Sequence, residues 1–297
     1  MNDSAHLKYL AINPFDLKWG AAVNTVGYQN ILPGMSYPPT DHPTRYLFFE
    51  EKGRVLNEYQ LLYITNGRGV FKSASLEHPV QVSKGMMFLL FPGEWHSYKP
   101  DSEIGWKEYW IGFQGSQIDS WVENYFFTKE RPVLNVGLHN DIVELYNTAI
   151  NVAANQESGF QQLLAAIVGH LLGLAYFYDK NEVFRSSQLN NQINRAKQLI
   201  AEQYRSIGPE NVAQIIGMSY SNFRKAFKQY TGFSPAKYIL DVRFSKTKEA
   251  LTNTTLSIRE VASLMGFDNY EYFFTAFRNL TGMTPSEYRA VTQGKSL

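Results

Sequence analysis

Two stretches near the C-terminus repeat each other at a fixed offset of fifty residues. The first reads GMSYSNFRKAFKQYTGFSPAKY (217–238) and the second reads GFDNYEYFFTAFRNLTGMTPSEY (266–288). The repeated residues are Phe223, Ala226, Phe227, Thr231, Gly232, Pro235 and Tyr238, which return as Phe273, Ala276, Phe277, Thr281, Gly282, Pro285 and Tyr288. A helical unit used twice in one chain suggests a target that also repeats, and double-stranded DNA repeats at every helical turn.

Each copy has the plan of a helix-turn-helix motif. A short helix ends at Gly217 in the first copy and at Gly266 in the second, since glycine tolerates the left-handed backbone of a sharp turn. A polar residue that can cap the next helix follows, Ser219 in the first copy and Asp268 or Asn269 in the second. The paired phenylalanines lie four residues apart and anchor one helical face, and proline opens the helix beyond. The second copy has one extra residue in its turn.

Charge is divided unevenly along the 297 residues. Residues 1–186 carry 14 lysine and arginine against 19 aspartate and glutamate residues, a net charge of −5, and residues 187–297 carry 14 against 8, a net charge of +6. A basic C-terminal third on an acidic body is the electrostatic layout expected of a DNA-binding unit.

The N-terminal 115 residues have the pattern of a β-rich domain. Predicted strands cover Tyr59–Ile64, Gly69–Lys72, Val80–Val82, Met86–Phe91 and Trp106–Phe113, and turns are predicted at Asn66–Gly69, Lys84-Gly85 and Pro92-Gly93. Short strands between glycine and proline turns favour a small barrel or sandwich.

From residue 117 the apolar residues follow helical spacing. Two segments with this spacing, around Ile142–Ala149 and Phe160–Tyr178, come before a polar run over 179–191 that is predicted to be a linker. The wide apolar arc of the second segment suggests burial on more than one side, in part against a second copy of the chain. Beyond the linker, helices are predicted over Ile193–Tyr204, Val212–Ile216, Asn222–Tyr230, Pro235–Leu251, Ile258–Met265, Tyr270–Leu280 and Pro285–Arg289.

Several classes of protein are excluded by composition. The chain contains no cysteine, so it forms neither disulfides nor thiolate metal sites. No basic start precedes an apolar run at the N-terminus, and no window of about 18 apolar residues occurs, so we expect neither a signal peptide nor a membrane span. These features predict a cytoplasmic protein.

The C-terminal third resembles the AraC/XylS family of transcription regulators. The family signature is met by Gly266, Phe267, Phe273, Phe277, Arg278, Gly282, Thr284, Pro285, Tyr288 and Arg289. The resemblance implies that 222–230 and 270–280 are recognition helices in successive major grooves, with 235–251 as a rigid connector. The expected DNA-contacting residues are Ser221, Arg224, Lys225, Arg259, Tyr270, Glu271, Phe274, Thr275 and Arg278. Phe274 could pack in the core instead, and we expect the more basic first copy to supply more of the affinity.

The stretch GMMFLLFPGEWH (85–96) resembles the second half of a cupin barrel. Enzymatic cupins bind a metal through several histidines, whereas no two of the six histidines here lie within four residues of each other, so we predict neither an enzyme nor a bound cofactor. The family's sugar-responsive members share the order of LLYITNGRG, PGEWHSY and WKEYWIGF. By that resemblance the ligand-binding residues are Arg54, His96, Tyr98, Glu108 and Trp110. Lys52 or Arg45 could replace Arg54, and His96 could be structural.

The predicted fold class is therefore α+β with two domains. A cupin-like effector-binding and dimerisation domain covers 1–180, a linker covers 181–190, and an all-α domain with two helix-turn-helix motifs covers 191–297. The predicted function is sequence-specific transcription regulation, as an activator that responds to a small molecule. The expected partners are a sugar effector, double-stranded DNA, RNA polymerase and a second copy of the chain. Two alternatives stay open: a constitutive DNA binder whose barrel only dimerises, and a cupin-type enzyme.

Overall fold

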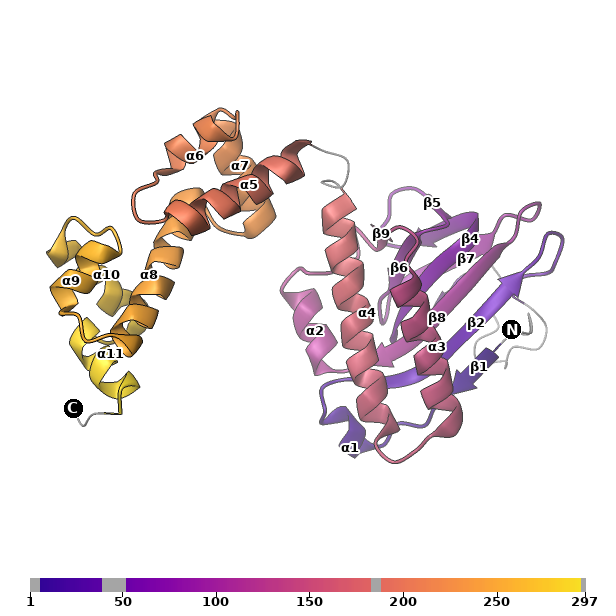
Figure 1. Cartoon of the computed structure of the whole chain (residues 1–297). Coiled ribbons are helices and arrows are strands. Elements are labelled where there is room, and N and C mark those ends of the chain that lie inside the picture. The colour runs from indigo at the N-terminus through magenta and orange to yellow at the C-terminus, as the bar shows by residue number, and fades with distance from the viewer. Residues whose placement is uncertain (1–5, 39–51, 183–187, 295–297) are drawn as a thin grey trace. The chain divides into compact units, whose positions relative to one another are not determined.

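The computed structural model describes residues 6–38, 52–182 and 188–294, which belong to two compact units, 1–183 and 184–297. In the described residues, the first unit joins β-strands to helices and the second consists of helices (Figure 1). The predicted α+β class, with a sheet-rich domain followed by helices and a helical C-terminal domain, is confirmed.

The strands of the first unit are β1 (His6–Tyr9), β2 (Ala22–Ile31), β3 (Arg54–Val55), β4 (Tyr59–Ser73), β5 (Val80–Ser83), β6 (Met86–Leu90), β7 (Trp95–Pro100), β8 (Trp106–Gln114) and β9 (Val133–Asn135). One sheet has the order β1-β2-β8-β4-β6-β9. In the other, β3 pairs with β7, β7 with β4, and β4 with β5. All of these pairs are antiparallel, and the long strand β4 belongs to both sheets.

Strand β4 continues through the Asn66–Gly69 segment, so the prediction of a turn there is wrong. Up to Ile64 the strand pairs with β6, and from Gly69 it pairs with β7, with a register shift against β8 in between. A Cβ atom on Gly67 would overlap the carbonyl oxygen of Gly105, and one on Gly69 would overlap that of Lys99. The two glycines therefore allow neighbouring strands to approach closely where β4 passes from one sheet to the other.

Side chains along the central strands alternate between two apolar cores. On β4, Tyr59, Leu61 and Tyr63 belong to the core shared with the helices, whereas Leu62 and Ile64 belong to the core between the sheets. The helices of this unit are α1 (Pro14–Leu17), α2 (Ser116–Glu123), α3 (Asn140–Asn155) and α4 (Phe160–Glu182). Helices α3 and α4 lie side by side across the face of the larger sheet (Figure 1). The side chains that line the space between the two sheets thus form a core of their own, separate from the one that packs against the helices.

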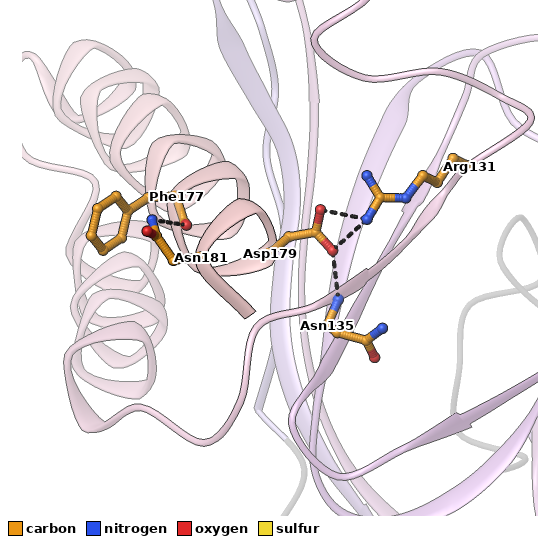
Figure 2. A network of polar contacts seen from close by, with 5 residues as sticks. All are labelled: Arg131, Asn135, Phe177, Asp179 and Asn181. Atoms are coloured by element: carbon orange, nitrogen blue, oxygen red, sulfur yellow. Dashed lines mark hydrogen bonds and ion pairs between the residues drawn. The ribbon is translucent and has the colours of Figure 1, made fainter. Parts of the chain in front are cut away.

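Helix α4 extends further than the sequence predicts. It ends at Glu182, and the next helix, α5, begins at Gln188, so both ends of the linker predicted over 181–190 are helical. Asp179 is only 3% exposed, and its two carboxylate oxygens accept hydrogen bonds from Nη2 of Arg131 at 2.9 and 2.7 Å (Figure 2). Oδ1 also accepts from the backbone N–H of Asn135 at 3.0 Å. The sequence does not distinguish a buried, ion-paired aspartate from a solvated one. The polar run predicted to be the linker therefore began at 179, which lies within α4.

Among the described residues, α4 is the one helix long and apolar enough to cross a membrane by length and composition. Of its most apolar window, 44% is buried. Leu164, Val168, Leu171 and Ala175 are less than 1% exposed and pack in the core with the sheet and α3. These contacts are those of a core helix.

The helices of the second unit are α5 (Gln188–Gln203), α6 (Pro209–Ile215), α7 (Tyr220–Thr231), α8 (Pro235–Asn253), α9 (Ile258–Leu264), α10 (Tyr270–Thr281) and α11 (Pro285–Thr292). Pairs α6–α7 and α9–α10 form the two helix-turn-helix motifs, and α8 follows the first pair and precedes the second. Ser219 caps α7 through its side chain, and Asn269, one of the two expected candidates, caps α10.

The sequence repeat reappears as a repeat of packing. The ring of Phe227 lies edge-on to Tyr238 with centroids 5.2 Å apart, and Phe277 lies edge-on to Tyr288 at 5.5 Å. Gly232 and Gly282 end the two recognition helices in the left-handed conformation. The identical residues are therefore those that build the unit, and the residues that differ are free to serve recognition.

Candidate functional site

A cavity inside the barrel is lined by Tyr9, Thr25, Tyr37, Pro38, Arg54, Gln60, Leu62, Tyr98, Glu108 and Trp110. Four of the five predicted ligand residues, Arg54, Tyr98, Glu108 and Trp110, are among them. The fifth, His96, lies next to Arg54 and is not part of the lining. The arrangement follows from the strands: Trp106, Glu108 and Trp110 project inward from β8, and β3 and β7 supply Arg54 and Tyr98. Trp106 belongs to the core around the cavity and is 2% exposed.

Arg54 is held in place by hydrogen bonds to neighbours that include Tyr98, Gln60 and His96. Its Nη2 donates to the hydroxyl of Tyr98 at 2.7 Å and to Oε1 of Gln60 at 3.4 Å, and its Nε donates to Nε2 of His96 at 3.3 Å. Since arginine can only donate, Nδ1 of His96 carries the proton and donates to the carbonyl of Glu94 at 3.1 Å. Burial, and then the charge of Arg54, lower the pKa of His96 to about 4. The neutral histidine thus orients Arg54 within the cavity.

Lys52 and Arg45 were the two other candidates for the role of Arg54 in the ligand site. Lys52 is exposed and is not part of the cavity lining. Arg45 lies outside the described residues.

Tyr37 fills much of the cavity. Its hydroxyl lies 3.2 and 3.3 Å from the two carboxylate oxygens of Glu108, and its ring lies edge-on to Trp106 with centroids 5.9 Å apart. The free volume beside it is about 30 Å³, room for about one or two water molecules. Tyr37 was not predicted, because it lies outside the strands that carry the family resemblance. This volume is too small for a monosaccharide, and Tyr37 and Pro38 are the lining residues that come from outside the strands.

Two polar groups of the cavity are buried in an unfavourable environment. Glu108 is 3% exposed, and burial raises its pKa to about 8, against the opposing effects of the Tyr37 hydrogen bond and the charge of Arg54. The hydroxyl of Thr25 is buried and has no hydrogen-bond partner among the described residues. A buried hydroxyl without a partner costs about 1–3 kcal/mol, and a ligand hydroxyl would satisfy it.

The raised pKa of Glu108 predicts a pH dependence of stability. A glutamate whose pKa rises from 4.5 to about 8 on folding contributes stability that is lost as pH increases toward 8. The opposite contribution of His96, whose pKa falls from 6.5 to about 4, is made mostly below pH 6.5, and less than about 0.5 kcal/mol of it is added above that pH. Between pH 6.5 and 8 we therefore expect the free energy of unfolding of the barrel unit to fall by about 1–2 kcal/mol.

Urea unfolding followed by tryptophan fluorescence measures this change, because all five tryptophans lie within residues 1–183. The matched variant Glu108→Gln should remove the decrease. A wild-type stability that stays constant over this range would show that Glu108 is ionised in the folded protein.

The second candidate site is the outward face of α7 and α10. Ser221, Arg224 and Lys225 are exposed on α7, while Phe223 and Phe227 are fully buried beneath them. An exposed, basic face on a helix anchored by two aromatic residues can contact phosphates and base edges in a major groove.

On α10 the predicted DNA-contacting residues differ in exposure. Glu271, Thr275 and Arg278 are exposed, but Tyr270 and Phe274 are half-buried, with ring centroids 6.3 Å apart. Tyr270 packs against the core of the second motif, so its assignment as an outward residue needs correction. Arg259 is exposed and its guanidinium lies 5.2 Å from the centroid of the Tyr270 ring.

Sequence reasoning missed three exposed positions on these faces. Tyr272 is 53% exposed on α10, and its equivalent at the fifty-residue offset is the exposed Asn222 on α7. Lys228 is exposed at the position equivalent to Arg278. The offset could have identified Lys228 from the predicted Arg278, whereas neither member of the pair Asn222 and Tyr272 was predicted.

A barrel with a polar interior cavity, joined to two helix-turn-helix motifs, defines the class of two-domain transcriptional regulators. Residues 24–182 match the family model described as an AraC-like ligand binding domain, and residues 212–290 match a model described as a helix-turn-helix domain. The first match alone spans more than half of the chain. The chain therefore belongs to the AraC/XylS family of DNA-binding transcriptional regulators.

Several curated relatives resemble the chain over most of its length. The Msm operon regulatory protein of Streptococcus mutans is 27% identical over 288 residues, 95% of each chain. The raffinose operon transcriptional regulatory protein of Pediococcus pentosaceus is 28% identical over 79% of this chain and 86% of its own. The arabinose operon regulatory protein of Escherichia coli is 28% identical over 84% of this chain and 86% of its own. These relatives are named as regulators and not as enzymes, and no group of three metal-ligating side chains occurs among the described residues.

Proposed function

We propose that the chain is a sugar-responsive activator of transcription that acts as a homodimer in the cytoplasm. In this proposal the barrel and its helices, about 1–180, bind the effector and dimerise, and about 191–297 read DNA and bring RNA polymerase to a promoter. The observation that carries the proposal is the buried polar cavity that gathers Arg54, Tyr98, Glu108 and Trp110 from three strands.

The chemistry of the cavity supports a carbohydrate effector. A sugar offers hydroxyls that both donate and accept, and an apolar ring face that stacks on an aromatic side chain. Arg54 can donate to a sugar oxygen, Glu108 can accept from a hydroxyl, and the Thr25 hydroxyl can do either. Trp110 supplies an aromatic surface. The relatives named for raffinose and arabinose operons support the same class of ligand.

The exposed aromatic side chains near α2 and α4 support dimerisation. A groove of about 190 Å³ is lined by Trp121, Phe126, Phe127, Gly169, Leu172, Gly173 and Tyr176. Beside it, Tyr125 is 84% exposed. An apolar surface of this kind on a soluble domain marks an interaction site, and the glycines of α4 would let a second copy approach closely.

Titration of sugars into the full chain tests the effector proposal. Arabinose, lactose and raffinose are added while tryptophan fluorescence and melting temperature are recorded. A saturable response to one of them is expected. A protein that responds to none of them, yet binds its operator, would favour the alternative in which the barrel only dimerises.

Replacing Arg224 by alanine tests the DNA proposal. Arg224 is exposed on α7, so the change should leave the fold intact. If its guanidinium contacts a guanine edge, binding to the promoter fragment beside the gene should weaken by about 1–3 kcal/mol. Fluorescence anisotropy at fixed salt measures the affinity, with the exposed Lys246→Ala on α8 as the control for lost positive charge. Equal affinities for wild type and Arg224→Ala would show that α7 does not read the operator.

A further inference from the structure

One side chain of α8 joins the two helix-turn-helix motifs at a single point. Arg243 is half-buried, and its Nε donates to the carbonyl of Tyr204, at the end of α5. Its Nη1 donates to the carbonyl of Gly266, in the turn of the second motif, at 3.2 Å. Carbonyls from two elements 62 positions apart in the sequence are thus held by one guanidinium.

The turn of the second motif also presses directly on the chain after α5. Gly266 has a φ of 81°, and a Cβ atom on it would overlap the backbone carbonyl of Arg205. Gly217, its equivalent in the first motif, has a φ of 71° but nothing within 4 Å of such a Cβ. The two glycines therefore carry the same backbone requirement, and only Gly266 lies in a close backbone contact.

The end of α5 belongs to the second motif by its packing as well. Tyr204 lies in the core of the second motif, and its hydroxyl is 3.8 Å from Sδ of Met265. Most of α5, including Ile193 and Ile200, lies in the core of the first motif. The helix that supports the first motif thus ends within the second.

Helix α8 by itself does not explain how the two motifs keep one orientation. The cores of the two motifs are separate, and Ile239 packs in the first while Phe244 and Leu251 pack in the second. Val242 packs against both. With α8 alone, each motif could tilt about its own contacts with the helix, and a second connection is needed to prevent this.

We propose that the junction of Tyr204, Arg205, Arg243 and Gly266 fixes the separation of the recognition helices α7 and α10. Arg243 and Gly266 are then positioning residues that make the protein select operators by the spacing of their two contacted segments. This inference rests on the proposed reading of DNA by both helices, which requires them to match successive major grooves about 34 Å apart.

The distance between the recognition helices tests the junction without DNA. Gln229 on α7 and Asn279 on α10 are exposed and equivalent in the repeat, and the chain has no cysteine of its own. Nitroxide labels on Gln229→Cys and Asn279→Cys in the full chain report this distance by pulsed electron resonance. We expect a narrow distribution in the parent and at least a doubled width in Arg243→Met and Gly266→Ala.

Gly217→Ala is the matched control, because it introduces the same backbone strain without the overlap. Arg243→Lys retains the positive charge and is the variant to measure if Arg243→Met does not fold. Its distance distribution should have an intermediate width. Far-ultraviolet circular dichroism confirms that each variant is folded. A distribution as narrow in folded Arg243→Met as in the parent would overturn the proposal.

Operators with one or two base pairs inserted between the contacted segments test the consequence for recognition. The parent and Gly217→Ala should lose about tenfold or more in affinity on insertion, whereas Arg243→Met should lose less than about threefold. If Arg243 had a merely structural role, Arg243→Met would bind all operators more weakly by the same factor, and the loss on insertion would be as large as in the parent. That result would contradict the proposal. Absence of any operator preference in the parent would instead contradict the DNA-reading function, while the label distances would still decide on the junction.

Discussion

Replacing Tyr37 by alanine is expected to tighten sugar binding by about 10- to 100-fold, equivalent to about 1.4–2.8 kcal/mol. Tyr37 occupies the cavity through its contact with Trp106 and its hydroxyl beside Glu108, and leaves only about 30 Å³ free. In the proposed function a sugar has to displace the tyrosine before it binds, and we expect its apparent affinity to be reduced by the small fraction of protein with the tyrosine outside. The alanine variant no longer has this cost.

Isothermal titration with arabinose, lactose and raffinose measures the effect. Tyr37→Phe is the control, because it keeps the ring and removes only the hydroxyl beside Glu108. Its affinity should change by less than about tenfold. If Tyr37→Ala binds every sugar as weakly as wild type or more weakly, the ring supports the ligand and does not compete with it.

Replacing Arg131 by methionine is expected to destabilise the barrel unit by about 2–3 kcal/mol. The carboxylate of Asp179 is buried near the C-terminal end of α4, where the helix dipole disfavours negative charge (Figure 2). Without Arg131, the hydrogen bond described for the Asp179 carboxylate is the one from the backbone N–H of Asn135. The Arg131 side chain is 57% exposed, so water can replace part of what is lost, and the expected cost lies below that of a fully buried pair.

Urea unfolding by tryptophan fluorescence measures this free energy. Asn181→Ala, which removes a side-chain bond to the carbonyl of Phe177 in the same turn, should cost less than about 0.5 kcal/mol. The double variant Arg131→Met, Asp179→Leu should recover most of the loss, because no buried charge is then left unpaired. If Arg131→Met alone were as stable as wild type, the burial of the Asp179 carboxylate would not depend on its hydrogen bonds to Arg131.

The helical half of the fold was predictable because its determinants are local. The paired phenylalanines, the capping residues and the terminal glycines lie within one or two helical turns of each other, so spacing alone defines the motifs. The half-buried position of Tyr270 was not predictable, since it depends on which neighbours the core of the second motif brings into contact with the ring.

The β-rich half was predictable only in part. Strand alternation correctly put Trp106, Glu108 and Trp110 on one face. The Asn66–Gly69 segment was misread, because a glycine that permits a turn also permits close approach of other strands, and only the neighbours distinguish the two. Asp179 was misread for a similar reason, as its partners Arg131 and Asn135 are more than forty positions away in the sequence.

The sequence by itself determined the two-domain plan, the doubled motif and the family, since each depends on patterns repeated or preserved over short stretches. Only the tertiary structure decided that Tyr37 occupies the cavity, that Asp179 belongs to α4, and that Arg243 and Gly266 connect the two motifs. The physical reason is the same in all three cases. Each depends on contacts between residues distant in the chain, whose energy depends on burial and distance, and neither quantity is defined until the chain has folded.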